Sequence, residues 1–323
     1  MWSYAKAGVD LNERDVALRG LIGEVSKTLK NRNVLLDIGH YANLVDAGDK
    51  ALVLCTDGVG TKVMVARRMN RYDTIGIDCI AMNVNDAICV GAEPIAMVDY
   101  ITIDKPDPEI LKGIGKGLRK GADESGISII GGETAITPEL VNGFDLAGTC
   151  VGVVEKDRVI DGSDIKQGDT LIGLRSNGIH SNGFTLARKV LDIDERTGKE
   201  LLRPTRIYVK PILELISKIR VKGLAHITGG GLLNLKRLNK GMGFEIDDWP
   251  RVPWIFGAIE KGGVERAEMF RTFNMGIGFC VITSPEDAEE ALYLLKDYDP
   301  RIIGRTVKDK KRAIRLNEEA LLL

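Results

Sequence analysis

The sequence predicts a two-domain protein of mixed α/β (α+β) class. A chain of 323 residues is longer than one hydrophobic core usually holds together, so we expect two domains. Helical and strand patterns alternate in both halves of the chain. Residues 155–169 carry many charges, two glycines and little apolar periodicity, which is typical of a linker. We therefore expect one domain over residues 1–165 and a second over residues 166–323.

The composition excludes several classes of protein. Apolar residues make up 44% of the chain and the mean hydropathy is near zero, as in soluble globular proteins. A net charge of −1 leaves no positive excess to displace counterions, so nucleic-acid binding is not expected. Neither a membrane-spanning apolar stretch nor a signal peptide is evident. The five cysteines form no CxxC pair and are typical of buried thiols, which favours a reducing, cytoplasmic location.

The first half is predicted to begin with an amphipathic helix over residues 12–31, whose apolar stripe comprises Leu18, Leu21, Ile22, Val25 and Leu29. A strand follows up to residue 56. Asp107 and Pro108 form a favourable cap and first turn for a helix that ends near residue 125. The remaining predicted elements are a helix over 73–90 and strands over 95–103, 127–130 and 146–154. The strands at 51–54, 95–103 and 146–154 carry more apolar side chains than a sheet with one buried face would cover. We therefore expect a homodimer to bury the remaining apolar side chains.

The second half continues the alternation of strands and helices. The predicted strands cover residues 170–174, 223–227, 276–282 and 301–307. The predicted helices cover residues 183–191, 208–219, 231–238 and 285–295.

The stretch TDGVGTK at residues 56–62 is the most informative motif. It follows an apolar run, so its polar residues are expected at a strand end. Glycines allow backbone N–H groups to approach an anion, Asp57 offers oxygen ligands for Mg²⁺, and Lys62 supplies positive charge. The spacing is not that of a Walker A loop, and an ordinary Gly-rich turn would have the same pattern. The functional interpretation assigns nucleotide binding to Asp57, Gly58, Val59, Gly60, Thr61 and Lys62.

A second group lies on the predicted helix over residues 73–90. Asp78 and Asp86 are eight residues apart, about two helical turns, so both carboxylates can lie on one face. Asp86 has apolar neighbours, and a carboxylate in a buried helix needs a partner such as a metal or a lysine. The alternative is a solvated surface carboxylate. We interpret Asp86 as a metal ligand and Asn85 as part of the nucleotide site.

The third group is GGET at residues 131–134, directly after the predicted strand at 127–130. A glycine pair followed by an acid and a hydroxyl is typical of a binding loop. A tight turn whose glutamate caps the next element would give the same pattern. We assign Gly131, Gly132 and Glu133 to the cofactor site.

The second half contains two Gly-rich loops, SNGIHSNG at residues 176–183 and HITGGG at residues 226–231. Both open onto predicted helix starts, whose free N–H groups and dipole favour phosphate. His180, among Ser, Asn and Gly donors, is a candidate general acid or base. Alternatively, it only hydrogen-bonds its loop or a substrate phosphate, and the glycine run is a flexible turn. The substrate-binding candidates are Ser181, Asn182, Gly183, His226, Thr228, Gly229, Gly230 and Gly231.

These groups together predict a Mg²⁺–polyphosphate site in the first half and a second anion site in the second half. That combination suggests phosphoryl transfer from a nucleotide to a phosphorylated small molecule. The residues alone do not identify that molecule.

The motifs, in collinear order over nearly the whole chain, resemble the phosphoribosylformylglycinamidine cyclo-ligase family, the aminoimidazole ribonucleotide synthetases of purine synthesis. Besides the stretches above, the resemblance includes SYAKAGVD at 3–10, GAEP at 91–94, DLAG at 145–148 and RTFNMGIG at 271–278. It implies ring closure of formylglycinamidine ribonucleotide to 5-aminoimidazole ribonucleotide with ATP and Mg²⁺. It also implies a homodimer in which the N-terminal sheets join in a central β-barrel.

The resemblance further implies roles for individual residues. Asp57 and Asp86 correspond to the metal carboxylates, and residues 58–62 to the triphosphate loop. His180 and the glycines of both loops would lie at the reacting centre and the substrate phosphate. We expect His180 and Lys62 to serve catalysis.

One region departs from the family pattern. Bacterial and eukaryotic members carry a Gly-rich, Phe-containing loop before TDGVGTK, whereas this chain has LDIGHYANL at residues 36–44, with a single glycine. Asp37 or His40 is therefore a candidate for nucleotide contact.

Other ATP-dependent enzymes of the superfamily are the nearest alternatives: selenophosphate synthetase, thiamine-monophosphate kinase, a hydrogenase-maturation dehydratase and formylglycinamidine ribonucleotide synthetase. They typically carry an acid where His226 stands, or a catalytic cysteine near the N-terminus, and this chain has neither. A non-catalytic nucleotide-binding assembly protein is the alternative from another class. It predicts ATP binding without substrate-dependent ADP release.

Overall fold

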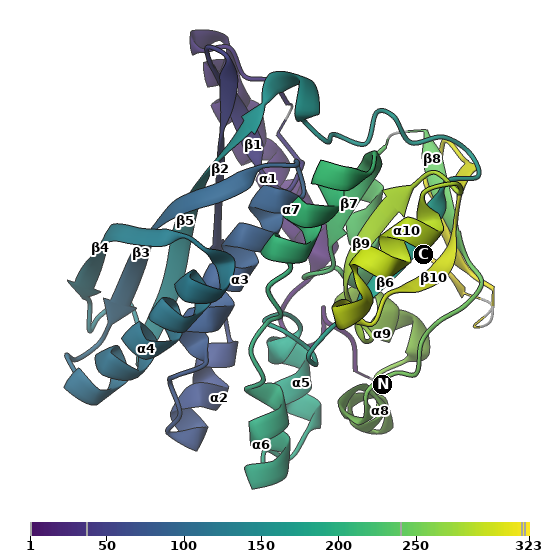
Figure 1. Cartoon of the computed structure of the whole chain (residues 1–323). Coiled ribbons are helices and arrows are strands. Elements are labelled where there is room, and N and C mark those ends of the chain that lie inside the picture. Colours follow the sequence, from purple (N-terminus) through teal and green to yellow (C-terminus); the bar gives the residue numbers. More distant parts are fainter. Residues whose placement is uncertain (1, 37, 240, 318, 320) are drawn as a thin grey trace.

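The computed structural model describes residues 2–36, 38–239, 241–317, 319 and 321–323 (Figure 1). The first half of the chain builds one sheet and the second half builds another, with helices packed around both, which confirms the mixed α/β class. The chain passes from the first sheet to the second through residues 156–169, which include the short 3₁₀ helix η2 (Lys156–Arg158).

The first sheet is open and has the strand order β1-β2-β5-β3-β4. Its neighbours pair antiparallel except β3 and β4, which run parallel. The strands are β1 (Asn43–Ala47), β2 (Lys50–Gly58), β3 (Glu93–Ile103), β4 (Ser128–Ile136) and β5 (Phe144–Glu155).

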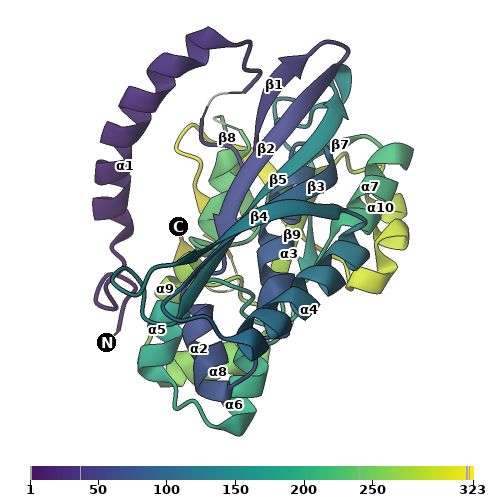
Figure 2. The ribbon, with the colours of Figure 1, turned by 90° about the vertical axis from the view of Figure 1, so that its left-hand side faces the viewer.

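Helix α3 (Ile75–Ile88) packs on β2, β3 and β5, and helix α4 (Pro108–Ser125) packs on α3 (Figure 2). Every residue of α3 is buried except Asp86, because the helix lies between the sheet and the second domain. Helix α2 (Lys62–Met69) precedes it. The predicted start of α4 is confirmed: Asp107 accepts hydrogen bonds from the backbone N–H of Glu109 at 2.9 Å and of Ile110 at 3.2 Å.

On the other face of the first sheet, large apolar side chains stay exposed, and no helix of the described part of the chain covers them. Along β2, Ala51 and Val53 point into the core and are fully buried, while Leu52 and Leu54 alternate outward. Other large apolar side chains exposed on these strands are Ile95, Val98, Tyr100, Ile130 and Ile136.

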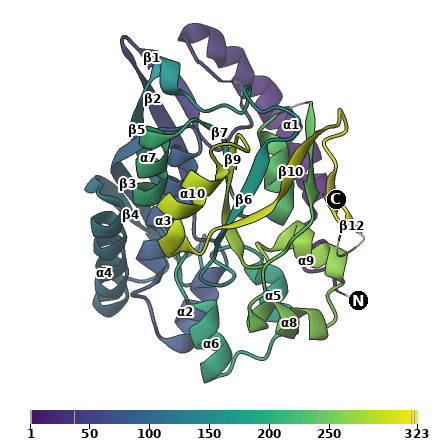
Figure 3. The same cartoon turned by 45° about the vertical axis from the view of Figure 1, so that its right-hand side comes forward.

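The second sheet has the order β12-β11-β8-β10-β6-β9-β7. Its strands are β6 (Thr170–Arg175), β7 (Val221–His226), β8 (Met242–Ile246), β9 (Ile277–Thr283), β10 (Arg301–Lys308), β11 (Ile314–Leu316) and β12 (Leu321–Leu322). Strand β9, which lies between β6 and β7, is buried throughout. Helices α7 (Val209–Lys218) and α10 (Ala288–Leu294) lie together on one face of this sheet (Figure 3). The other helical elements are α5 (Phe184–Val190), α6 (Glu195–Leu201), α8 (Trp254–Lys261), α9 (Arg266–Thr272) and the 3₁₀ segment η4 (Lys296–Tyr298).

Three predicted elements differ from the structure in extent or in helix type. The N-terminal helix α1 (Leu11–Val25) gives way to a 3₁₀ segment, η1 (Ser26–Asn31), and Leu18, Leu21 and Val25 of its stripe are exposed because α1 stands away from the body (Figure 2). The predicted helix at 231–238 is a 3₁₀ segment, η3 (Gly231–Arg237). The predicted strand at 127–130 continues as β4 through the GGET motif.

Candidate functional site

Two polar motifs of the first half, TDGVGTK at 56–62 and the group at 78–86, meet the Gly-rich loops of the second half at the interface between the domains. Strand β2 extends through Asp57 and Gly58, so Asp57 lies at a strand end as expected, whereas Gly58 belongs to the strand and not to the predicted loop. The turn that follows, Val59-Gly60-Thr61, leads into α2. Gly60 has a positive φ of 66°, which favours glycine, and the Thr61 hydroxyl lies 3.1 Å from that of Thr185 in the second domain.

Asn83 fixes the backbone of Asp57 from helix α3. Its side-chain oxygen accepts the Asp57 N–H at 3.0 Å, and its amide donates to the Asp57 carbonyl at 3.1 Å. The Asp57 carboxylate accepts the N–H of Gly58 at 2.7 Å. Asn83 was missed in the sequence analysis. A polar side chain in the otherwise apolar sequence of this buried helix was a usable signal.

Asp86 forms a pair with His226 across the domain interface. The Asp86 Oδ1 lies 2.8 Å from the His226 Nδ1, and the Asn85 amide lies 3.4 Å from the His226 Nε2. Because Nε2 faces an amide donor, the imidazole carries its proton on Nδ1 and donates it to the carboxylate. Asn85 is itself held by the Arg206 carbonyl at 2.8 Å and the Tyr208 N–H at 2.9 Å.

The electrostatics favour a cation beside these carboxylates. Burial raises the pKa of Asp57 to about 6, and the negative charge of Asp86 adds to the shift. Two nearby carboxylates suit Mg²⁺, which prefers oxygen ligands and retains waters. Among the described residues, no group of three His, Cys, Asp or Glu side chains could hold a metal ion. A metal at Asp57 and Asp86 would therefore complete its coordination with water or phosphate oxygens.

Lys62 is placed differently from the expectation that it contacts phosphate. Its ammonium is fully buried and lies 2.8 Å from Asp78 Oδ2. It donates to the carbonyls of His180 at 3.0 Å and Arg203 at 2.7 Å. All three N–H groups of an ammonium therefore have acceptors inside the protein, and none is free for a nucleotide in this arrangement.

His180 is buried rather than open to the pocket. It adopts a positive φ of 62°, and its Nε2 accepts the backbone N–H of Asn177 at 3.2 Å and of Arg206 at 3.5 Å. Burial, His226 and Lys62 hold the pKa of His180 well below its usual range. The neutral imidazole thus uses its acceptor nitrogen within the loop, which argues against general-base catalysis from this arrangement.

The two Gly-rich loops converge, as expected for substrate-binding candidates. A Cβ on Gly229 would lie 2.8 Å from the side-chain oxygen of Asn182, so the loops touch there. Ser181 is buried, with its hydroxyl 3.1 Å from that of Thr205. Gly183 is the N-cap of α5, and the carbonyl of Thr228 accepts the N–H of Gly231 at 2.9 Å. Gly231 must be glycine, because a Cβ would lie 2.2 Å from the Phe270 carbonyl oxygen.

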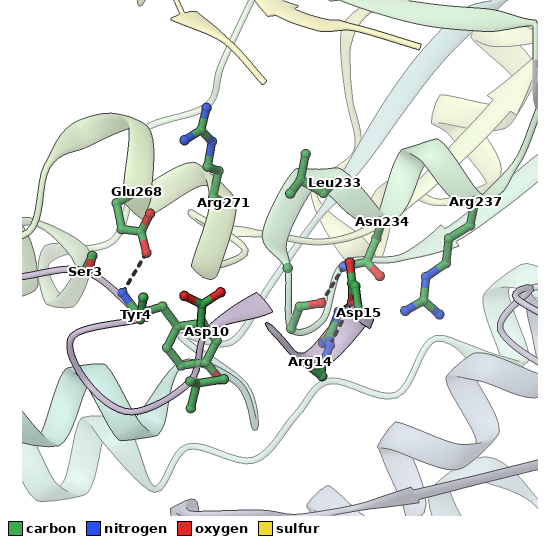
Figure 4. A pocket seen from close by; sticks show the side chains of 14 residues that line it. Ser3, Tyr4, Asp10, Arg14, Asp15, Leu233, Asn234, Arg237, Glu268 and Arg271 are labelled. Atoms are coloured by element: carbon green, nitrogen blue, oxygen red, sulfur yellow. Dashed lines mark hydrogen bonds and ion pairs between the residues drawn. The ribbon is translucent and has the colours of Figure 1, made fainter. Parts of the chain in front are cut away.

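A pocket of about 480 Å³ lies between the glycine loop and the N-terminal segment (Figure 4). Gly229 and Gly230 line it together with Asn234, whose amide donates to the Gly229 carbonyl at 3.1 Å. The N-terminal wall is anchored by the Tyr4 N–H, which donates to Glu268 at 2.7 Å. The charged side chains that line it are Asp10, Arg14, Asp15, Arg237, Glu268 and Arg271.

The GGET residues are not at this site. Gly131, Gly132 and Glu133 are exposed on the edge strand β4, where Gly132 pairs with Asp99 of β3. Asp99 pairs with Gly148 of β5, which pairs with Asp57 of β2. Three strand spacings, roughly 14 Å, therefore separate Gly132 from Asp57. A pair of glycines can continue a strand, and the pattern alone did not reveal this.

His40 lies near both Asp86 and the pocket. Neither ring nitrogen is exposed or hydrogen-bonded within the described part of the chain. Burial and the nearby Arg237 lower its pKa to about 4, and Asp161 and Asp86 oppose that shift. The hydroxyl of the adjacent Tyr41 donates to the Asn234 carbonyl at 3.0 Å. Asp37, the other candidate in this region, lies outside the described residues.

Comparison with known proteins agrees with this geometry. Residues 39–154 match the family "AIR synthase related protein, N-terminal domain", and residues 166–317 match "AIR synthase related protein, C-terminal domain". The chain belongs to the AIR synthase family. Proteins named phosphoribosylformylglycinamidine cyclo-ligase are similar to it over most of their length. The one from Methanobrevibacter smithii is 50% identical and covers 98% of each chain, and that from Pyrococcus furiosus is 55% identical over 92% of each.

Solved structures share the fold of this AIR synthase family member. A structure titled "AaThiL complexed with AMPPCP and TMP" matches with a TM-score of 0.69 at 18% identity, covering 94% of each chain. The "Crystal structure of HypE-HypF complex" matches with a TM-score of 0.67 at 22% identity, covering 88% of this chain and 92% of that one. At these identities the likeness concerns the fold alone.

Proposed function

We propose that this chain catalyses the ATP-dependent ring closure of formylglycinamidine ribonucleotide to 5-aminoimidazole ribonucleotide, with release of ADP and phosphate. The observation that carries the proposal is the pair of carboxylates, Asp57 and Asp86, together with Arg237, whose charge acts on Asp57 and which lines the arginine- and glycine-containing pocket. The chain is also 50% and 55% identical, over nearly its whole length, to relatives named for this reaction.

The nucleotide end of the proposed site is formed by the end of β2 and the turn after it. Asp57 and Asp86 would hold Mg²⁺, and the backbone of Gly58, Val59, Gly60 and Thr61 would face the phosphates. The metal, when bound, neutralises charge on the phosphoryl group being transferred. The repulsion between the two carboxylates supports this assignment, because a divalent cation would relieve it.

The substrate end of the proposed site is the pocket in Figure 4. Arg237 and Arg271 offer positive charge for a ribose phosphate, and the Gly229-Gly230 backbone allows close approach. The guanidinium of Arg237 lies 4.9 Å from the centroid of the Tyr41 ring, which holds it in place.

The chemistry needs activation and positioning. Transfer of the γ-phosphoryl group to the formyl oxygen turns that oxygen into a leaving group. The amidine-side nitrogen then attacks the same carbon, the C–O bond breaks, phosphate leaves and a proton is lost as the imidazole forms. Holding the reacting ends together can contribute on the order of 7–11 kcal/mol. His226 would act by orienting Asp86, whereas proton transfer by His180 stays a prediction that its buried position does not favour.

We also propose a homodimer formed through the open face of the first sheet, in a reducing, cytoplasmic setting. The exposed apolar row of Leu52, Leu54 and Tyr100 supports the dimer. All five thiols are free, which fits a reducing compartment. No helix among the described residues is long and apolar enough to span a membrane.

The test is a coupled assay with purified protein, formylglycinamidine ribonucleotide, ATP and Mg²⁺. We expect one ADP for each aminoimidazole ribonucleotide formed, and no ADP release without the substrate. ATP binding without substrate-dependent ADP release would instead support a nucleotide-binding assembly protein.

A further inference from the structure

A buried ion pair lies at the centre of the domain interface. Lys62 at the start of α2 and Asp78 on α3 are both completely inaccessible to solvent, and their charged atoms are 2.8 Å and 2.9 Å apart. Removing two charges from water is costly, so a pair of this kind persists only where further hydrogen bonds satisfy both groups. The surroundings of the two groups therefore indicate what the pair does.

Among the residues that the structure describes, every further hydrogen-bond partner of the two charged groups comes from the second domain. Lys62 donates to the carbonyls of His180 and Arg203, at 3.0 Å and 2.7 Å. Asp78 Oδ1 accepts both the N–H and the hydroxyl of Thr205, each at 2.7 Å. The pair thus binds two separate segments, the Gly-rich loop at 176–183 and the segment at 203–206.

These two segments also hold the imidazole of His180. Its Nε2 accepts one N–H from Asn177 in the first segment and one from Arg206 in the second. The Thr205 hydroxyl lies 3.1 Å from that of Ser181, which joins the segments again. Contacts with both segments therefore stabilise the backbone of His180 in its positive-φ conformation.

The pair is also connected to the carboxylate end of the site. Lys62 follows Asp57 by five residues, and Asp78 lies on the same helix as Asp86. A displacement of the loop at 176–183 would therefore change its distance from both carboxylates.

We propose that Lys62 and Asp78 form an electrostatic brace that positions the loop at 176–183 of the second domain against the carboxylates of the first. In this account Lys62 is a positioning residue and does not bind the triphosphate. The catalytic consequence rests on the proposed function, while the structural consequence does not.

The test uses the double variant Lys62→Met/Asp78→Asn, which removes both charges together and keeps an acceptor for Thr205. The matched control is Lys218→Met/Glu214→Gln, which makes the same change in an exposed pair on α7. Because the chain has three histidines, ¹⁵N-histidine labelling resolves each imidazole, and His180→Gln identifies the signal of His180.

We expect the His180 signal of the double variant to lose the neutral, Nδ1-protonated signature of the wild type, while the control keeps it. We expect kcat to fall about 100-fold, because a displacement of about 1 Å can have that effect. The KM for ATP should stay within about twofold of wild type, since Asp57 and Asp86 are untouched.

An unchanged His180 signal in the double variant would contradict the proposed brace. A raised KM for ATP with kcat retained would also contradict it, because that result would show that Lys62 binds the nucleotide. If the wild-type protein shows no ring closure, the proposed function fails, but the imidazole signals still test whether Lys62 and Asp78 position the loop at 176–183. Should the double variant not fold, Thr205→Val removes one contact and leaves the ion pair. A smaller shift of the His180 signal in the same direction would support the brace, and no shift would contradict it.

Discussion

Asp57 lies in surroundings that oppose its own negative charge. Burial and the neighbouring Asp86 raise its pKa from 3.8 to about 6 in the folded protein. Between those two pH values the folded state binds more protons than the unfolded state. The free energy of unfolding therefore falls as the pH rises through this window, by about 3 kcal/mol for this residue.

Asp57→Asn should remove this penalty. Without nucleotide or Mg²⁺ at pH 7, we expect the variant to have a higher Tm than wild type and a flatter dependence of stability on pH between 4 and 6. It should also lose ring closure, because a neutral amide is a poor metal ligand. The measurement is thermal unfolding across that pH range.

Asp49→Asn is the matched control, since Asp49 is exposed in the turn between β1 and β2. It should leave the stability profile unchanged. If Asp57→Asn lowers the Tm at pH 7, the account of opposed charges at this site is wrong.

His180 can be tested by two substitutions that differ in whether a hydrogen-bond acceptor remains in place of its Nε2. Its Nε2 accepts two backbone N–H groups, and a glutamine carbonyl can occupy a similar position. We expect His180→Gln to retain kcat within about tenfold, whereas His180→Ala should lower kcat about 100-fold, because a loop displaced by about 1 Å can have that effect. Steady-state kinetics at pH 7 distinguish the two roles. An equal loss in both variants would show that proton transfer is the function of His180.

At the scale of elements, the open face of the first sheet requires a partner. Leu52 and Leu54 of β2 and Tyr100 of β3 are each about 40–50% exposed on one continuous face. We expect Tyr100→Glu to convert the dimer to a monomer, because a buried, unpaired carboxylate is costly. Sedimentation velocity at micromolar concentration measures the change.

Tyr293→Glu on α10 is the control, since Tyr293 is 68% exposed on the second domain. It should leave the protein dimeric. A wild-type protein that sediments as an active monomer would rule out the interface.

Some elements could be predicted from local chemistry, and others could not. Asp107 and Pro108 specify the start of α4 through contacts with their immediate neighbours in the sequence, so the local sequence was sufficient to predict it. The stripe on α1 indicated a helix correctly, but periodicity does not say whether the chain itself covers the stripe. Gly131 and Gly132 suggested a loop, yet pairing with β3 keeps them in a strand, and such pairing depends on distant residues.

At the scale of the molecule, the site is assembled from pairs that lie far apart in the sequence. Asp86 and His226 are 140 residues apart, and Lys62 and the His180 carbonyl are 118 apart. The motifs pointed to Asp57 and Asp86, and the structure brings these two carboxylates close enough for the charge of one to act on the other. The motifs could not indicate that the Lys62 ammonium is held in a buried ion pair, because that depends on how the two domains dock.

In the proposed reaction, ATP activates the formyl oxygen of the substrate at this interface. The most direct measurement uses formylglycinamidine ribonucleotide labelled with oxygen-18 in the formyl group, with mass spectrometry of the released phosphate. The account predicts one labelled oxygen in each inorganic phosphate, because the oxygen that accepts the phosphoryl group leaves with it. Unlabelled phosphate, with the label recovered in water, would contradict the claim.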